Sequence, residues 1–195
     1  MTQQKFLFSF SGMGEPFFNF SNVISNIKHL AIIYPNSQIT ITTTGVKPNL
    51  IRELANLSLP LVIKIHLSLH SPTDQSRRIL MPKVVGLKQS LSALKYFAQK
   101  TSTTPKLNYI LIRNVNDSPE MAEKLAILVR ERPFIVKLST LNESGNLKSS
   151  TNCAVERFEN ILSQNSIKTC RFTSLGTDIA AGCGQLRQQR DLNES

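Results

Sequence analysis

A chain of 195 residues, 41% of them hydrophobic, is long enough to bury one good core and predicts a single domain. Its formal net charge of +10 favours an anionic partner, with RNA or DNA ahead of a membrane surface. A solvated basic surface on a small-molecule enzyme is the alternative that the charge leaves open.

Neither a targeting segment nor a metal site is indicated. The first ten residues, MTQQKFLFSF, are expected to be neither a signal peptide nor a membrane span, because their apolar part is short and no cleavage site follows. The three cysteines, Cys153, Cys170 and Cys183, form no close-spaced metal pattern. They predict a reducing, cytoplasmic setting. A membrane is not an expected partner.

In chain order, short apolar runs alternate with segments of helical periodicity, a pattern typical of βαβ units and a parallel sheet. The run at 5–10 indicates a buried strand, and alternation at 61–70 places Lys64, His66, Ser68 and His70 on one face. Ser118, Pro119 and Glu120 indicate a helix start. Strands are expected at 5–10, 38–44, 61–70, 106–112, 134–141 and 167–173, and helices near 20–30, 49–57, 87–97, 118–129 and 155–162.

This order predicts an α/β fold, an open or partly closed (β/α) barrel, in which ligands bind at the carboxyl ends of the strands. Polar candidates lie at four such ends. Gly12 to Glu15 follow the first strand, Thr42 lies near the end of the second, Ser68 to His70 end the third, and Asn142 follows the fifth.

Two of these candidates also have ordinary explanations. Glu15 precedes Pro16, which favours an extended conformation at the strand end, but it could equally be a loop glutamate. His70 alone is more often a satisfied polar group than a ligand.

The cysteines differ in their expected environments. Cys153 at a predicted helix start and Cys170 in a predicted strand are typical of buried, inert thiols. Cys183, held between Gly182 and Gly184 in a loop of small residues, could act as a nucleophile once deprotonated, or be an unremarkable cysteine.

Six segments together resemble one family, the radical S-adenosylmethionine (SAM) methyltransferases that modify C2 of adenosine in 23S rRNA and tRNA, with their C8-methylating relatives. The segments occur in the family's order and cover most of residues 5–186. They are GMGEP at 12–16, ITITTTGVKP at 39–48, SLHSPTD at 68–74, NYILIRNVNDSPE at 108–120, the strand and loop ending in Asn142, and DIAAGCGQL at 178–186.

The resemblance implies a SAM site and a methyl-accepting cysteine. Gly14 and Glu15 match the positions that hold the amino group of SAM, and Cys183 matches the cysteine that is methylated and carries the one-carbon unit to the base. Further cofactor contacts are implied at Thr42, Ser68, Leu69, His70 and Asn142.

The resemblance also implies a [4Fe–4S] cluster on three cysteines at CxxxCxxC spacing, upstream of GMGEP. These residues contain no such motif, and Met1 stands only eleven residues before Gly12. The expected fold is therefore a partial (β/α) barrel of the radical SAM type over residues 1–186, without the first, cluster-bearing strand, followed by a polar tail at 187–195. Asn108 also replaces a residue that is usually acidic in the family.

The leading functional hypothesis is a truncated or split RNA adenine methyltransferase that is not active alone and needs a cluster-bearing N-terminal chain, or acts as a homo-oligomer, on rRNA or tRNA. A non-catalytic protein that binds RNA or a nucleotide is the alternative. A decayed product without function is the third. Without its neighbouring strand, the strand at 5–10 is expected to leave an exposed sheet edge.

Overall fold

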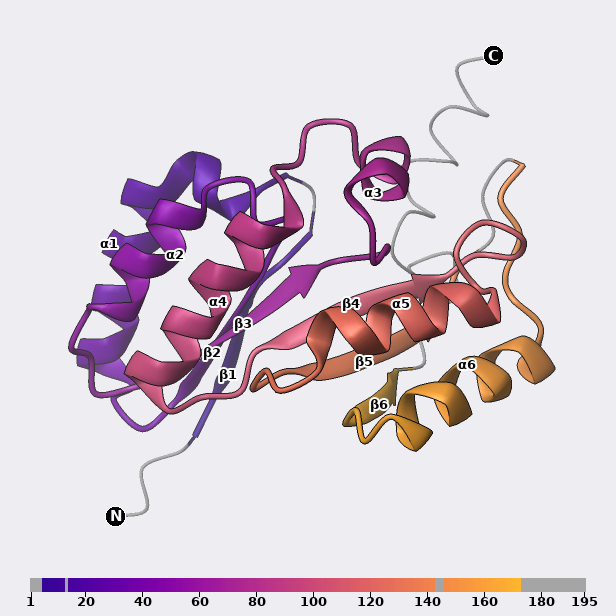
Figure 1. Ribbon diagram of the computed structural model, residues 1–195. Coiled ribbons are helices and arrows are strands. Elements are labelled where there is room, and N and C mark those ends of the chain that lie inside the picture. The colour runs from indigo at the N-terminus through magenta and orange to yellow at the C-terminus, as the bar shows by residue number, and fades with distance from the viewer. Residues whose placement is uncertain (1–4, 13, 143–145, 173–195) are drawn as a thin grey trace. The chain divides into compact units, whose positions relative to one another are not determined.

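The computed structural model describes residues 5–12, 14–142 and 146–172. The predicted polar tail at 187–195 lies outside these residues. Six strands follow one another in the sheet order β1-β2-β3-β4-β5-β6, and the described chain is an α/β fold, as predicted (Figure 1). The strands are β1 (Leu7–Phe10), β2 (Gln38–Thr43), β3 (Val62–Ser68), β4 (Lys106–Leu111), β5 (Ile135–Thr140) and β6 (Thr169–Phe172).

Each of the predicted helices is present, and one α-helix was not predicted. The short 3-10 helix η1 (Pro16–Asn19) leads directly into the first α-helix. The α-helices are α1 (Phe20–Ile33), α2 (Pro48–Ala55), α3 (Asp74–Leu80), α4 (Leu87–Thr101), α5 (Pro119–Val129) and α6 (Asn152–Gln164). No helix of the described residues is long and apolar enough to cross a membrane.

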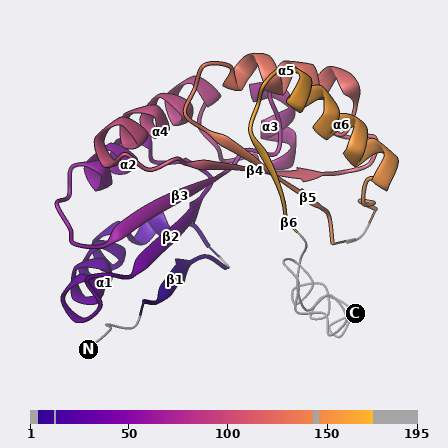
Figure 2. The same ribbon diagram turned by 90° about the horizontal axis from the view of Figure 1, so that it is seen from below.

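The described chain divides into two compact units, and the first contains β1, β2 and β3 with α1 to α4. The three strands pair in parallel, so that Phe10, Ile41 and Ile65 share one row and Thr42 lies beside His66. One face of β2 and β3 is buried, and Figure 2 shows α2 and α4 side by side against these strands. The opposite face is half-exposed and carries polar side chains, including Thr42, His66 and Ser68.

The second unit contains most of β4, then β5 and β6 with α5 and α6. β5 and β6 are parallel, and α5 packs beside α6 (Figure 1). Ser118 caps α5 by accepting a hydrogen bond from the Met121 amide, at 3.4 Å, with Pro119 at the first position. The predicted start of this helix is therefore confirmed.

The expectation of a buried first strand is wrong. Leu7 is 68% exposed, and the residues of β1 alternate between exposed and half-exposed. β1 is an edge strand: among the described residues its ladder runs only to β2. Apolar runs usually mark buried strands, but here the aromatic rings of the run pack against Tyr34 at the end of α1. The centroid of Tyr34 lies 4.9 Å from that of Phe6 and 5.5 Å from that of Phe8.

Candidate functional site

The Glu15 carboxylate joins the loop after β1 to the end of β2. Its Oε1 accepts from the Phe17 amide at 3.2 Å and from the Thr43 hydroxyl at 2.6 Å. Its Oε2 accepts from the amide and the hydroxyl of Thr44, both at 2.7 Å. Glu15 has φ −110° and ψ 114°, the extended conformation predicted for a residue before proline. A negative charge is thus held in a fixed position at the carboxyl end of two parallel strands.

Gly14 presents open backbone next to this carboxylate. Its φ of +99° lies where L side chains are strained, and no heavy atom lies within 4 Å of the position that a Cβ would take. Gly14 is exposed, so a ligand can approach its main chain without displacing a side chain.

The half-exposed face of β2 and β3 carries two further predicted residues. Thr42 lies beside His66 in the ladder, and Ser68 follows two residues later on the same face of β3. Hydroxyls on this face can donate to a ligand and accept from it. In this unit the structure therefore brings Glu15, Thr42 and Ser68 to the carboxyl-terminal half of adjacent strands.

Leu69 differs from its neighbours because its side chain is fully buried in the core. Its carbonyl oxygen accepts a hydrogen bond from Arg77 Nε at 3.2 Å. The prediction of a cofactor contact at Leu69 can therefore concern its main chain and not its side chain.

Arg77, which sequence analysis did not identify, organises the same strand ends. Its guanidinium is fully buried and donates to the carbonyls of Thr44 at 2.6 Å, Ser68 at 3.2 Å, Leu69 at 3.2 Å and Val85 at 2.8 Å. Burial lowers the pKa of Arg77, and the nearby Asp74 carboxylate opposes that shift. The residue spans from α3 to the ends of β2 and β3, so it holds the backbone that carries the predicted site.

In the second unit, His70 is fixed in a left-handed conformation with φ 53°. Its Nδ1 accepts from the Ile110 amide at 3.2 Å, which leaves Nε2 as the protonated nitrogen of the neutral ring. Its backbone is held by two bonds: its amide donates to the Asn108 carbonyl at 3.3 Å, and its carbonyl accepts from Asn116 Nδ2 at 2.8 Å. Asn142, two residues beyond β5, is half-buried.

Asn108 stands out in this unit because its Oδ1 is buried and has no hydrogen-bond partner among the described residues. Buried polar atoms are normally paired, so this acceptor can take a donor from a bound molecule. Tyr109, the next residue of the strand, packs on Phe158 and donates to the Asn116 carbonyl at 2.9 Å. Burial raises the pKa of Tyr109, with a further contribution from Asp117, so this phenol is a structural donor.

The cysteines do not form a cluster site among the described residues. Cys153 lies in the first turn of α6 and Cys170 in β6, as predicted, but neither is buried as expected for an inert thiol: Cys153 is exposed and Cys170 is half-exposed. No group of three His, Cys, Asp or Glu side chains that could hold a metal ion is present in the described ranges. A [4Fe–4S] cluster thus does not fit the residues described. Cys183 and the segment 178–186 lie outside them.

Comparison with solved structures defines the class of fold. A radical SAM methyltransferase from Sphaerobacter thermophilus matches with a TM-score of 0.82 and 29% identity, over 91% of this chain and 53% of that one. A domain of a pyruvate-formate lyase-activating enzyme from Bacteroides vulgatus matches with a TM-score of 0.66 and 15% identity, over 85% of this chain and 98% of that one, and shows the fold alone. The chain has the α/β fold of the radical SAM proteins.

Similar curated sequences indicate which group of radical SAM proteins this chain is related to. The sequence named "Probable dual-specificity RNA methyltransferase RlmN" of Clostridium tetani is 34% identical over 94% of this chain, and its namesakes in Thermotoga maritima and Symbiobacterium thermophilum are 36% and 38% identical over 95% and 91%. The chain spans about half of their length, at 54%, 55% and 50%. No protein-family model matches the chain. The chain is therefore a homologue of the RlmN radical SAM RNA methyltransferases over about half of their length, as the sequence motifs predicted.

Proposed function

We propose that these residues form the SAM-binding and RNA-contacting part of an RNA adenine methyltransferase of the RlmN type, in a cytoplasmic setting. The observation that carries this proposal is the Glu15 carboxylate, held by four donors at the ends of β1 and β2 beside the open backbone of Gly14. A fixed carboxylate suits the ammonium group of SAM, because opposite charges attract strongly where solvent is partly excluded.

The chemistry of the donors supports the same ligand. Two of the four groups on Glu15 are hydroxyls, of Thr43 and Thr44, which can rotate and free a lone pair for an incoming ammonium. The Thr42 and Ser68 hydroxyls add donors and acceptors on the adjoining strand face. Bound SAM would supply the methyl group, and Cys183 is proposed to accept it.

We further propose that methyl transfer needs cluster ligands contributed by polypeptide outside these residues. The three cysteines stand at 153, 170 and 183, far from CxxxCxxC spacing, and SAM loses the binding that the open iron would add. SAM binding by these residues alone is therefore expected to be weak. A cluster-bearing polypeptide or a second copy of the chain is the proposed partner, with rRNA or tRNA as the proposed substrate.

Calorimetric titration of SAM into the purified chain tests the cofactor site. We expect saturable binding that Glu15→Ala abolishes, because the ammonium loses its counter-charge. Ser68→Ala is expected to weaken binding about 3- to 10-fold, the effect of one lost hydrogen bond. Glu53→Ala, which removes an exposed carboxylate from α2, is the matched control and should bind like the parent.

Absence of binding at millimolar SAM, or equal binding by Glu15→Ala and Glu53→Ala, would contradict the proposed cofactor site. The alternative function, a non-catalytic RNA-binding protein of this fold, is favoured by the charge of +10 without cluster cysteines. RNA binding without methylation, even after reconstitution with a polypeptide that carries the cluster motif, would support that alternative.

A further inference from the structure

A largely apolar hollow of about 360 Å³ lies in the first unit, beside the Glu15 loop. Three loops build it: the turn after β1 supplies Phe18, the segment after β2 supplies Val46, and the segment between α3 and α4 supplies Met81 to Val84. We call it the Phe18 pocket. Glu15 and Thr44 complete the lining, and of the lining residues only Glu15 belongs to the predicted SAM contacts.

Phe18 is exposed to an extent that packing does not explain. The two adjacent phenylalanines of η1 have opposite environments: Phe17 is 2% exposed and stacks on Phe20 at 5.7 Å, whereas Phe18 is 66% exposed. The turn therefore needs one buried ring to hold it in place and presents the other to solvent. A large exposed aromatic side chain at the edge of an apolar hollow indicates a binding surface.

One lysine lies near this ring and a second lines the pocket. Lys47 Nζ lies 5.9 Å from the centroid of Phe18, in a cation–π arrangement, and Lys83 lines the pocket from the opposite loop. Both lysines are exposed. The one carboxylate in the lining, Glu15, directs its oxygens to the donors of Phe17, Thr43 and Thr44.

We propose that the Phe18 pocket binds one unpaired base of an RNA strand, stacked on the Phe18 ring, while Lys47 and Lys83 neutralise the neighbouring phosphates. Stacking platforms flanked by basic side chains are the common means of holding single-stranded nucleic acid. The proposal rests on the proposed RNA-binding function and adds the site at which a base is held. The adenine of SAM suits the pocket less well, because SAM has no phosphate and its sulfonium would lie near two lysines.

The test uses the whole chain and a short fluorescent single-stranded RNA, with binding measured by anisotropy. Phe18→Leu keeps the apolar side chain but removes the ring, and is expected to lower affinity about 5- to 100-fold, the range for loss of one stacked base. Phe18→Tyr should bind like the parent. Tyr96→Leu is the matched control, because Tyr96 also lies under cations, Arg52 at 5.1 Å and Lys100 at 5.8 Å, but does not line the pocket.

An abasic RNA of the same length separates the base from the backbone. Parent and Phe18→Leu should bind it equally, because no base remains to stack. The double variant Lys47→Gln/Lys83→Gln should reduce the slope of log affinity against log salt by about 1.4, since each phosphate neutralised on a single strand contributes about 0.7. Lys88→Gln/Lys95→Gln, on the exposed side of α4, is the control for charge alone.

Equal RNA affinity of parent and Phe18→Leu, or an equal loss on the abasic strand, would overturn the base pocket while leaving the proposed RNA binding intact. Loss of SAM binding in Phe18→Leu without loss of RNA binding would also overturn it and assign the pocket to the cofactor. Failure of the parent to bind RNA would overturn both the proposed base pocket and the RNA-binding part of the proposed function. The SAM titration tests the cofactor-binding part separately.

Discussion

At the level of single residues, two side chains of opposite charge hold the same strand ends. Glu15 accepts four hydrogen bonds, and Arg77 donates hydrogen bonds to four carbonyl oxygens. Both involve Thr44, whose amide donates to Glu15 and whose carbonyl accepts from Arg77. Hydrogen bonds to two charged groups thus fix the conformation at the end of β2.

Arg77→Met is expected to lower the free energy of unfolding by at least about 3 kcal/mol. Four carbonyl oxygens would lose a donor, and each buried unsatisfied acceptor costs about 1–3 kcal/mol. Urea unfolding followed by circular dichroism measures the change. Arg78→Met is the matched control on the same helix: Arg78 is exposed, and its loss should change stability by less than about 0.5 kcal/mol. Similar losses in both variants would show that the carbonyl contacts of Arg77 contribute little.

At the level of elements, α3 is the one α-helix of the described residues that hydrophobic periodicity did not predict. Its one fully buried side chain is Arg77, so Asp74–Leu80 has no apolar stripe to detect. The helix instead begins at Thr73, whose hydroxyl accepts from the Ser76 amide at 3.3 Å, with Asp74 in the first turn. A capping signal was present in the sequence, but a helix organised around a buried guanidinium has no other signature.

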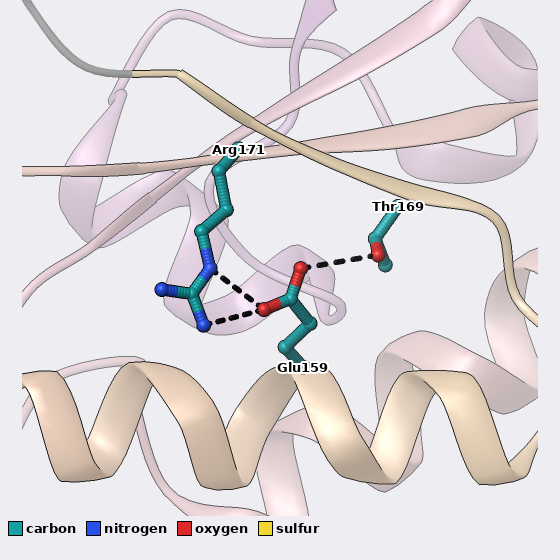
Figure 3. A network of polar contacts seen from close by, with 3 residues as sticks. All are labelled: Glu159, Thr169 and Arg171. Carbon is teal, nitrogen blue, oxygen red and sulfur yellow. Dashed lines mark hydrogen bonds and ion pairs between the residues drawn. The ribbon is translucent and has the colours of Figure 1, made fainter.

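The contact between α6 and β6 is also polar. Glu159 accepts from Arg171 Nε at 2.7 Å and Nη2 at 2.6 Å, and its other oxygen accepts from Thr169 at 3.4 Å (Figure 3). Thr169 and Arg171 alternate with Cys170 along β6, so they present the same face to α6.

Despite its good geometry, this ion pair is expected to contribute little to stability. Arg171 is 51% exposed and Glu159 24%, so water screens the charges. Glu159→Gln should lower the free energy of unfolding by less than about 1 kcal/mol. A double-mutant cycle with Arg171→Gln, repeated at high salt, measures the coupling, which should shrink as salt increases. A coupling that is large and independent of salt would contradict a solvent-screened pair.

At the level of the whole molecule, the net charge of +10 predicts that the proposed binding of RNA depends strongly on salt. If about four phosphates are neutralised, log affinity should fall with log salt with a slope of about −2.8 for a single strand. Filter binding over a series of salt concentrations measures the slope. An RNA affinity that does not change with salt would exclude electrostatic binding. It would favour a role in which the basic side chains are only solvated at the surface.

Local signals in the sequence were enough to establish the class of fold and to predict which candidate residues lie near strand ends. Alternating apolar runs and helical periodicity located each strand of the described residues and all of their α-helices except α3. Glu15, Thr42 and Ser68 were predicted as site residues because residues at the strand ends of a parallel sheet gather at one edge, and the structure places them at such ends. The order of the six motifs indicated the family, because unrelated chains rarely share so many segments in one order.

The side-chain contacts of these residues became apparent only from the packing of the folded chain. Leu69 is core, β1 is an edge strand, Arg77 ties three segments together, and Phe18, but not Phe17, faces solvent. Burial and hydrogen bonding depend on segments distant in the chain. No local pattern therefore predicts which of two adjacent phenylalanines, or of two adjacent arginines, is buried. Pairing of strands and packing of helices give each of these side chains its environment, and that environment decides its role.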